Sequence, residues 1–163
     1  MTTIAAKFST LEIAADTIIS GDDSFYRVSK LRFGPNSIYG ACGDWNKCLK
    51  ALSLVEKKSP KPSDWEADLE VTILQLRKDG LWIYESSIIP TKLKNDYWAV
   101  GTGANFAITA MRLGKSPAEA VAIASEFDPY TRTPIESYKL EIKNDNKNKR
   151  PRVHSDLAKS RQP

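Results

Sequence analysis

The sequence predicts an α+β domain, and three patterns along its 163 residues support that class. β-rich segments open the chain and recur in its middle. Apolar residues at helical spacing follow Gly43, and a helix-capping signature stands at Ser116. This order of elements indicates two sheets between helical layers: strands, a helix, further strands, two helices and a last strand.

The first half of the chain holds four predicted strands and one helix. The strands are 2–8, 11–19, 28–33 and 37–41. Gly34-Pro35-Asn36 is a strong turn signal and closes the last two strands into a hairpin. The helix is predicted from apolar residues that share one face, at Trp45, Cys48, Leu49, Leu52 and Val55. It must stop before the proline-rich stretch 59–62, because proline cannot continue a helix.

The second half predicts four more strands and two helices. The strands are 69–76, 81–84, 97–100 and about 137–142. One helix follows Gly101-Thr102-Gly103 and runs to about Leu113. The other runs from Ser116 to about Phe127, because Ser116-Pro117-Ala118-Glu119 combines a capping box with proline at the first helical position.

Composition excludes several functional classes. The apolar content of 41% fits a globular chain, and no apolar run is long enough to span a bilayer. Cys42 and Cys48 do not make a metal set, and the one histidine, His154, lies in a polar tail, so zinc catalysis and a Ser-His-Asp triad are poorly supported. No signal segment precedes the first strand, which predicts a cytoplasmic protein with both thiols reduced.

The net charge of +4 comes from the end of the chain. Residues 143–163 carry seven basic and two acidic residues, a net +5, which leaves 17 basic and 18 acidic residues, a net −1, in 1–142. We therefore predict a folded domain over 1–142 and a basic, disordered tail over 143–163. The domain lacks the charge of a nucleic-acid binder, so only the tail is a candidate for nucleic-acid binding.

The most informative local feature is the pair Met1-Thr2. An aminopeptidase is expected to remove a methionine that precedes a small residue, leaving Thr2 with a free α-amine beside its hydroxyl. An N-terminal amine titrates near ~8 and can accept the hydroxyl proton at neutral pH. Thr2 is therefore a candidate nucleophile that carries its own base.

Six segments in order carry a resemblance to a known family. They are Thr2-Thr3-Ile4-Ala5, Ala14-Ala15-Asp16-Thr17, Lys30, Gly40-Ala41-Cys42-Gly43-Asp44, Gly101-Thr102-Gly103-Ala104-Asn105-Phe106-Ala107 and Phe127-Asp128-Pro129-Tyr130-Thr131. Each alone is weak, but six in order at compatible spacing are specific. The chain resembles the proteasome β-subunit family, which includes the bacterial subunit HslV, from Thr2 to about Leu140. It is most similar to short proteasome-like peptidases of bacterial and phage genomes.

The resemblance implies the N-terminal-nucleophile hydrolase fold, a four-layer αββα sandwich whose catalytic threonine opens the first strand. It implies Thr2 as nucleophile, with Asp16 and Lys30 as the charged pair beside it. A buried carboxylate needs a cationic partner, and Lys30 would also favour the deprotonated forms of the threonine hydroxyl and amine. Arg27 is a rival for the basic position; the spacing from Lys30 to Asp44 matches the short peptidases without a gap and favours Lys30.

Four further catalytic roles follow from the resemblance. Gly43 would donate a backbone N–H to the oxyanion, a contribution of about 10²–10³ in rate. Asp128 and Thr131 match the family's supporting Asp and Ser. Thr102 matches a Ser that helps to position the free amine. The first substrate pocket is expected to be mostly apolar, with residues Ile19, Val28, Ala41 and Trp45.

The function implied is a threonine-type endopeptidase acting on peptides or unfolded proteins, without a cofactor. The alternative is an inactive proteasome-like subunit that serves in assembly. We expect a homo-oligomer, with double rings favoured over single ones. The segment 57–68 is shorter than the family's usual second helix, which helps to build contacts in stacked rings, so the resemblance supports rings less strongly than it supports the active site. The sequence does not identify an unfolding ATPase partner.

Overall fold

The computed structural model describes residues 2–20, 24–57, 60–66 and 69–141. Met1, whose removal the sequence predicts, lies outside the described residues. So does the predicted basic tail, 143–163. Among the described residues, no helix has both the length and the apolar character that crossing a bilayer requires.

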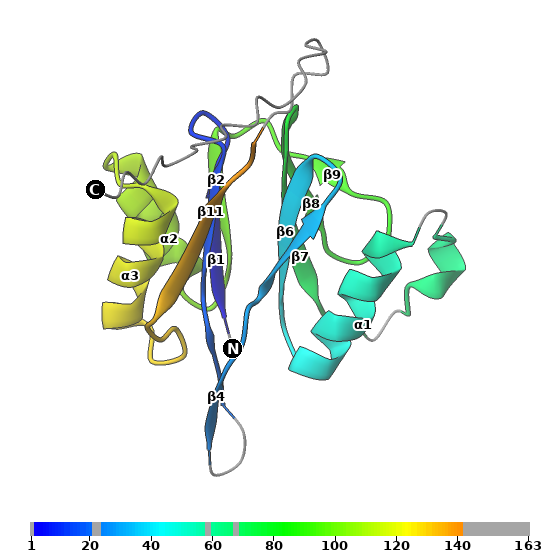
Figure 1. Cartoon of the computed structure of the whole chain (residues 1–163), viewed down its shortest axis with the longest axis horizontal. Coiled ribbons are helices and arrows are strands. Elements are labelled where there is room, and N and C mark those ends of the chain that lie inside the picture. The colour runs from blue at the N-terminus through cyan, green and yellow to red at the C-terminus, as the bar shows by residue number, and fades with distance from the viewer. Residues whose placement is uncertain (1, 21–23, 58–59, 67–68, 142–163) are drawn as a thin grey trace, which may run out of the picture.

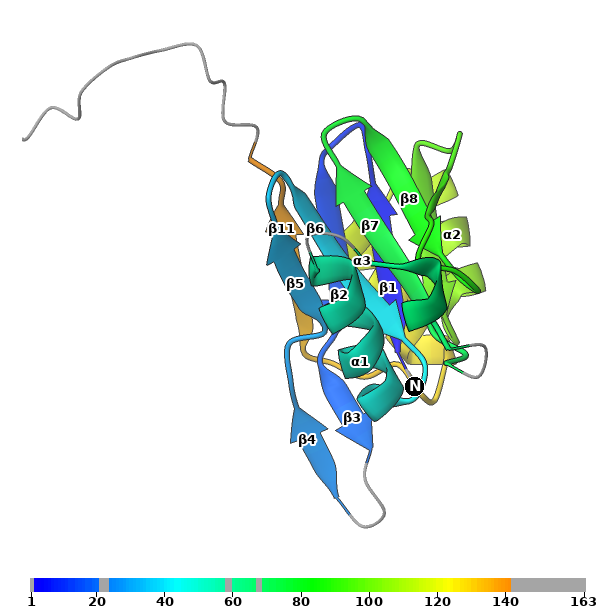
Figure 2. The same ribbon diagram turned by 90° about the vertical axis from the view of Figure 1, so that its right-hand side faces the viewer.

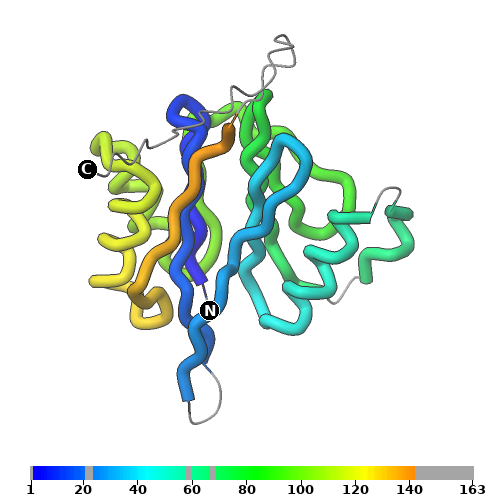
Figure 3. The backbone as a smooth tube through the Cα atoms, viewed as in Figure 1, coloured from blue at the N-terminus to red at the C-terminus, as the bar shows by residue number. Residues whose placement is uncertain are grey.

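Two antiparallel sheets form the body of the domain. The first has the order β10-β1-β2-β11, and the second has the order β5-β6-β7-β8-β9. Their strands are β1 (Thr3–Lys7), β2 (Glu12–Asp16), β5 (Leu31–Gly34), β6 (Ser37–Cys42), β7 (Thr72–Arg77), β8 (Gly80–Tyr84), β9 (Thr91–Lys92), β10 (Tyr97–Gly101) and β11 (Ile135–Lys139). Figure 3 shows β11 running beside β2, so strands from the two ends of the described chain are neighbours in the first sheet.

Helices cover the outer face of each sheet (Figure 1). α2 (Ala104–Arg112) and α3 (Pro117–Phe127) pack on the first sheet, and α1 (Trp45–Glu56) packs on the second. Alanines on β1 and β2, Ala5 and Ala14, face the α2–α3 layer, where their small side chains let the helices approach closely. Larger side chains on the same strands, such as Ile4 and Ile13, point the other way into the space between the sheets.

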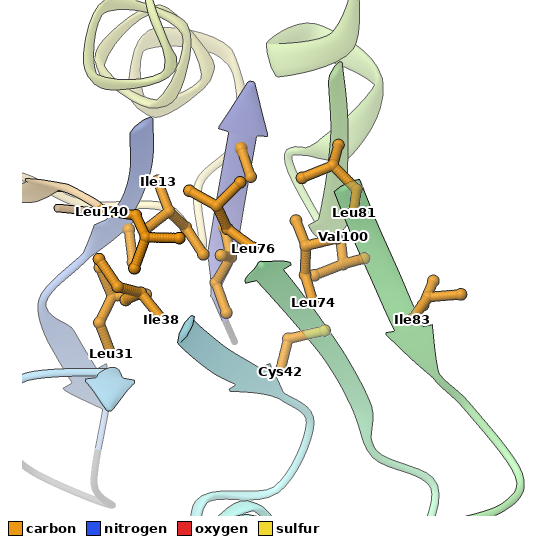
Figure 4. Close-up of a cluster of buried hydrophobic side chains, with 13 residues drawn as sticks. Ile13, Leu31, Ile38, Cys42, Leu74, Leu76, Leu81, Ile83, Val100 and Leu140 are labelled. Atoms are coloured by element: carbon orange, nitrogen blue, oxygen red, sulfur yellow. The ribbon is translucent and has the colours of Figure 1, made fainter. Parts of the chain in front are cut away.

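The main apolar core fills that space between the sheets. Figure 4 shows Ile13, Ile38, Leu74, Leu76 and Val100 converging there from both sheets. The alternation of the two faces along each strand decides which side chains reach this core and which meet the helices. Buried polar residues, among them Thr3 and Asp16, stand at the ends of strands that pack on this core.

A two-stranded ribbon projects beyond the two sheets. It consists of β3 (Ile18–Ser20) and β4 (Phe25–Arg27), which pair with each other but with neither large sheet. Figures 1 and 2 both show it extending past one end of the sheets. A short 3₁₀ helix, Pro62–Asp64, lies in the proline-containing connection after α1.

The fold is α+β with antiparallel sheets, as the sequence predicts, but several boundaries differ. The predicted strand 11–19 is broken at Thr17, whose hydroxyl donates to the carbonyl oxygen of Pro134 at 2.7 Å. β7 begins at Thr72 rather than at 69, since Glu70 has a φ of +46°, outside the β region. The last strand is Ile135–Lys139 instead of 137–142. β4, β9 and the 3₁₀ helix are absent from the sequence prediction.

Candidate active site

Thr2 and Thr3 lie at the start of β1, against the end of β10. Thr2 is 5% exposed, and its carbonyl oxygen accepts the Thr102 N–H at 3.1 Å. Thr3 pairs with Gly101 across the two strands. Gly101 has a φ of +99°, and a β-carbon there would overlap the carbonyl oxygen of Thr2. Glycine at this position is therefore what allows β10 to approach the first residues of β1.

Asp16 links the start of β1 to Lys30. Its Oδ1 accepts the backbone N–H of Thr3 at 2.9 Å, and its Oδ2 accepts from Lys30 Nζ at 2.8 Å. Lys30 Nζ also donates to the carbonyl oxygen of Ile18 at 2.7 Å. The side chains of Asp16 and Lys30 are 0% and 1% exposed. The peptide bond of Thr2 to Thr3 is thus held directly against a buried ion pair.

The structure places Lys30, and not Arg27, at this carboxylate. Arg27 ends β4 in the projecting ribbon, where its side chain is exposed. The two residues are only three apart, but the chain turns from the ribbon into β5 between them.

Burial and charge act in opposite directions on Lys30. Burial lowers the pKa of its ammonium group below the usual value, because water no longer solvates the charge. The negative charge of Asp16 and the hydrogen bond to it favour the protonated form and partly offset this effect. The nearby thiols are neutral at physiological pH, since burial raises the pKa of Cys42 to about 11 and of Cys48 to about 12.

A second carboxylate, Asp128, gathers hydroxyl groups on the other side of Thr3. Asp128 Oδ2 accepts from Thr102 Oγ1 at 2.6 Å and from Thr131 Oγ1 at 2.5 Å. Thr131 Oγ1 also lies 2.5 Å from Thr3 Oγ1. Because the Thr131 proton points to the carboxylate, Thr3 must donate to Thr131. Thr3 in turn accepts the Gly103 N–H at 2.9 Å, so the hydrogen bonds run in one direction from Gly103 to Asp128.

The pKa of Asp128 reflects the same contacts. Burial alone would raise it, but the hydrogen bonds from Thr102 and Thr131, with one from the Tyr130 N–H, stabilise the ionised form. The net pKa is lowered from the usual value of an aspartate. Asp128 is therefore a carboxylate that stays charged while it orders the two hydroxyls.

Gly43 lies at the turn from β6 into α1, at the same end of the molecule as the start of β1 (Figure 1). It has a φ of +138°, and a β-carbon there would come within 2.9 Å of the Glu70 carbonyl oxygen. The next residue, Asp44, caps α1 by accepting the Lys47 N–H at 3.1 Å. Gly43 is exposed, so its backbone is accessible to a ligand.

The four predicted pocket residues fall into two groups. Ile19, half-buried on β3, and Val28, whose N–H donates to the Thr17 carbonyl at 2.8 Å, belong to the projecting ribbon and its end. Ala41 belongs to the apolar cluster between the second sheet and α1, and Trp45, the first residue of α1, packs against that cluster. Ala41 is 1% exposed, so its side chain is not accessible to a ligand in this structure.

Two residues of the site were missed by the sequence analysis. Thr3 supplies a hydroxyl that joins Thr131, and the doublet Thr2-Thr3 is the signal that could have found it. Glu136 accepts the N–H groups of Lys30 and Leu31 through its Oε1. Nothing in its local sequence distinguishes it from other strand glutamates. Within the described residues, no group of three or more His, Cys, Asp or Glu side chains could hold a metal ion.

Comparison by sequence finds no matching family model and no matching curated protein. Comparison by structure finds clear similarity. HslV from Trypanosoma brucei matches with a TM-score of 0.68 at 16% identity, over 86% of this chain and 99% of that one. BPH from Thiobacillus denitrificans matches with a TM-score of 0.64 at 18% identity, over 86% of this chain and 98% of that one.

The same Thiobacillus protein in complex with epoxomicin matches at 15% identity with a TM-score of 0.64, over 86% of this chain and 100% of that one. These likenesses cover all but a small part of the chain. The resemblance read from the six sequence segments is confirmed at the level of the fold: the chain has an HslV-like, proteasome β-subunit-like fold.

Proposed function

We propose that this protein is a threonine-type endopeptidase of the N-terminal-nucleophile class, with an αββα sandwich that carries Thr2 at the start of its first strand. The observation that carries the proposal is Asp16, whose carboxylate binds the Thr3 N–H and Lys30 Nζ at once. That arrangement fixes the backbone between Thr2 and Thr3 and connects it through Asp16 to a buried cation. The HslV-like fold supports the same reading.

The nucleophile requires a free amine on Thr2, and hence cleavage of the Met1–Thr2 peptide bond. The amine then accepts the proton of Thr2 Oγ1 as the oxygen attacks the carbonyl carbon of a peptide bond. The C–N bond breaks, and the leaving amine takes that proton. Water then hydrolyses the ester, releasing the acid and restoring the hydroxyl.

Lys30 contributes positive charge close to the reacting threonine. A buried ammonium group stabilises the developing alkoxide more than an exposed one, because the surrounding dielectric is low. Asp16 keeps that ammonium in place and offsets part of the effect of burial on its pKa. Lys30 therefore lowers the barrier to deprotonation of Thr2 Oγ1 while Asp16 holds it charged.

Gly43 is proposed to donate its N–H to the oxyanion. Its exposed backbone lies at the start of α1, at the end of the molecule where β1 also begins. The positive end of the α1 dipole adds to the stabilisation of negative charge there. A donor of this kind contributes about 10²–10³ in rate.

Asp128, Thr102 and Thr131 are proposed to order the opposite side of the site. Thr102 binds Thr2 through its N–H and Asp128 through its hydroxyl, so it connects the nucleophile's backbone to the second carboxylate. Substrate contacts are proposed for Ile19 on the ribbon, for Val28 directly after it and for Trp45 on α1, with the buried Ala41 shaping the pocket from beneath. The substrates proposed are peptides or unfolded proteins.

We further propose that the protein works in the cytoplasm as a homo-oligomer, with double rings favoured, because an open peptidase site would cleave indiscriminately. Exposed apolar side chains on the α2–α3 layer are available for subunit contacts: Phe106 stacks on Phe127 with ring centroids 5.5 Å apart, and Leu113 is 78% exposed. Light scattering after size-exclusion chromatography checks this. An active monomer of 18.2 kDa would refute the proposal that an oligomer encloses the site, but it would not contradict the threonine mechanism.

The experiment for the activity compares the wild-type protein with Thr2→Ala on fluorogenic peptides, after intact-mass measurement has established which chains lack Met1. The proposal predicts hydrolysis by wild type lacking Met1 and none by Thr2→Ala. Epoxomicin, present in one of the similar structures, serves as a second probe whose binding should need Thr2. An inactive wild type with a free Thr2 amine would favour an assembly subunit instead.

A further inference from the structure

Glu136 lies where the edges of the two sheets meet. It belongs to β11, the edge strand of the first sheet, and its side chain reaches the start of β5, the edge strand of the second. Its Oε1 accepts the Lys30 N–H at 2.7 Å and the Leu31 N–H at 3.2 Å. These are contacts of a charged acceptor with two consecutive backbone donors, which are stronger than neutral hydrogen bonds.

The same strand also holds the other member of the ion pair. In the register of β2 and β11, Asp16 lies opposite Ile135 and Ala15 lies opposite Glu136. Ile135 therefore fixes Asp16 through strand pairing, and the adjacent Glu136 fixes Lys30 through its backbone N–H. The relative position of the two charged residues is set by β11 as well as by their own contact.

We propose that Glu136 is a positioning residue for the active site: it holds the Lys30 backbone so that Nζ stays between Asp16 Oδ2 and the Ile18 carbonyl. This inference rests on the proposed function, since it assigns Glu136 a part in the same chemistry. Glu136 contacts the backbone of Lys30 and not the reacting atoms, so it acts through Lys30. Misplacement of a catalytic group by about 1 Å can cost roughly 10²-fold in rate.

Glu136 also acts on Lys30 by charge. Two carboxylates, Asp16 on β2 and Glu136 on β11, favour the protonated ammonium group, and burial opposes them. The thiols of Cys48 on α1 and Cys42 on β6 also face Lys30 but are neutral at physiological pH. Loss of the Glu136 charge should therefore lower the pKa of Lys30 further and move the alkaline limb of the pH–kcat profile to lower pH.

The test compares Glu136→Ala and Glu136→Gln with a matched control at Glu12. Glu12 lies in the same strand pair, where its carboxylate accepts from Ser137 Oγ at 3.0 Å, and is 8% exposed. Glu136→Ala should lower kcat roughly 10- to 100-fold with KM within about twofold, because substrate binding is untouched. Glu136→Gln keeps an acceptor oxygen and should recover much of kcat while shifting the alkaline limb. Glu12→Ala should neither lower kcat nor shift the alkaline limb.

Amide hydrogen exchange gives a readout that does not need activity. Glu136→Ala should speed exchange at the Lys30 and Leu31 amides specifically, and Glu12→Ala should not. Unchanged exchange at both amides overturns the inference whether or not the enzyme is active. Faster exchange with wild-type kcat and an unmoved alkaline limb also overturns it. If wild type with a free Thr2 amine cleaves no peptide, the proposed function fails, and exchange alone decides whether Glu136 holds Lys30.

Discussion

Asp16 and Lys30 form a buried ion pair, with 2.8 Å between Oδ2 and Nζ and side-chain exposures of 0% and 1%. Each charge has further partners, since Asp16 Oδ1 binds the Thr3 N–H and Lys30 Nζ binds the Ile18 carbonyl. Desolvation makes such a pair a weak source of stability, but removing one partner leaves an uncompensated buried charge. The pair therefore adds little to the stability of the fold, which agrees with the role proposed for it beside Thr2.

The first prediction separates Lys30 from its neighbour Arg27. Lys30→Ala and the longer neutral variant Lys30→Met should lose on the order of 10²-fold in kcat/KM, because both remove the cation that is proposed to act on Thr2. Arg27→Ala, at an exposed position, should stay within about twofold. Peptide hydrolysis by folded protein measures both.

Stability must be followed in the same variants. Removing Lys30 should cost about 3–5 kcal/mol in the free energy of unfolding, since Asp16 is left buried without its partner. Urea unfolding gives this value and shows at which temperature the variants are still folded for the assay. Wild-type activity in Lys30→Met, or a larger loss in Arg27→Ala, would show that the cation has been assigned to the wrong residue.

The second prediction concerns Gly101, which lets β10 pass close to Thr2. Gly101→Ala should destabilise the fold strongly, because φ is +99° and the new β-carbon would overlap the Thr2 carbonyl oxygen. Gly114→Ala is the matched control, with a φ of +91° and no atom within 4 Å of the added carbon. The control should lose about 1–2 kcal/mol in the free energy of unfolding, because an alanine at a positive φ is strained even where space is available. Equal losses in urea unfolding would mean that the close approach to Thr2 is unimportant.

The third prediction is a pH dependence at Asp128. Its pKa is lowered in the folded protein, so the ionised carboxylate adds stability above the unfolded pKa of about 3.9. That contribution is lost as pH falls through the lower, folded pKa. The difference in unfolding free energy between wild type and Asp128→Asn should therefore be largest above about pH 4 and shrink below it. A difference that is flat from neutral pH to pH 2 would contradict the ionised network with Thr102 and Thr131.

Local signals predicted the helices and the hairpin well. Ser116 and Glu119 form the capping box in the structure, with Pro117 opening α3, because such a box depends only on residues within one turn. The hairpin of β5 and β6 turns where Gly34-Pro35-Asn36 stands, with Asn36 at a φ of +56°. These features are set by short-range sterics and hydrogen bonds.

The features that sequence could not supply depend on long-range packing. Lys30 and Arg27 are both basic residues near a strand, and only the turn into β5 decides which one is buried. Glu136 binds N–H groups 105 and 106 positions away along the chain, across two sheet edges. The break at Thr17 likewise follows from its bond to Pro134. The pairing of Asp16 with Lys30 entered only through the family resemblance.

If Thr2, with its own free amine, is the nucleophile, the substrate's acyl group becomes attached to Thr2 during the reaction. Acid quenching of a reaction with a peptide ester, followed by mass mapping, detects this intermediate. An acyl group is expected on Thr2 in wild type and on the substituted residue in a slower Thr2→Ser variant, with no acyl group and no turnover in Thr2→Ala. Acylation at another residue, or turnover by Thr2→Ala close to that of wild type, would contradict this role of Thr2.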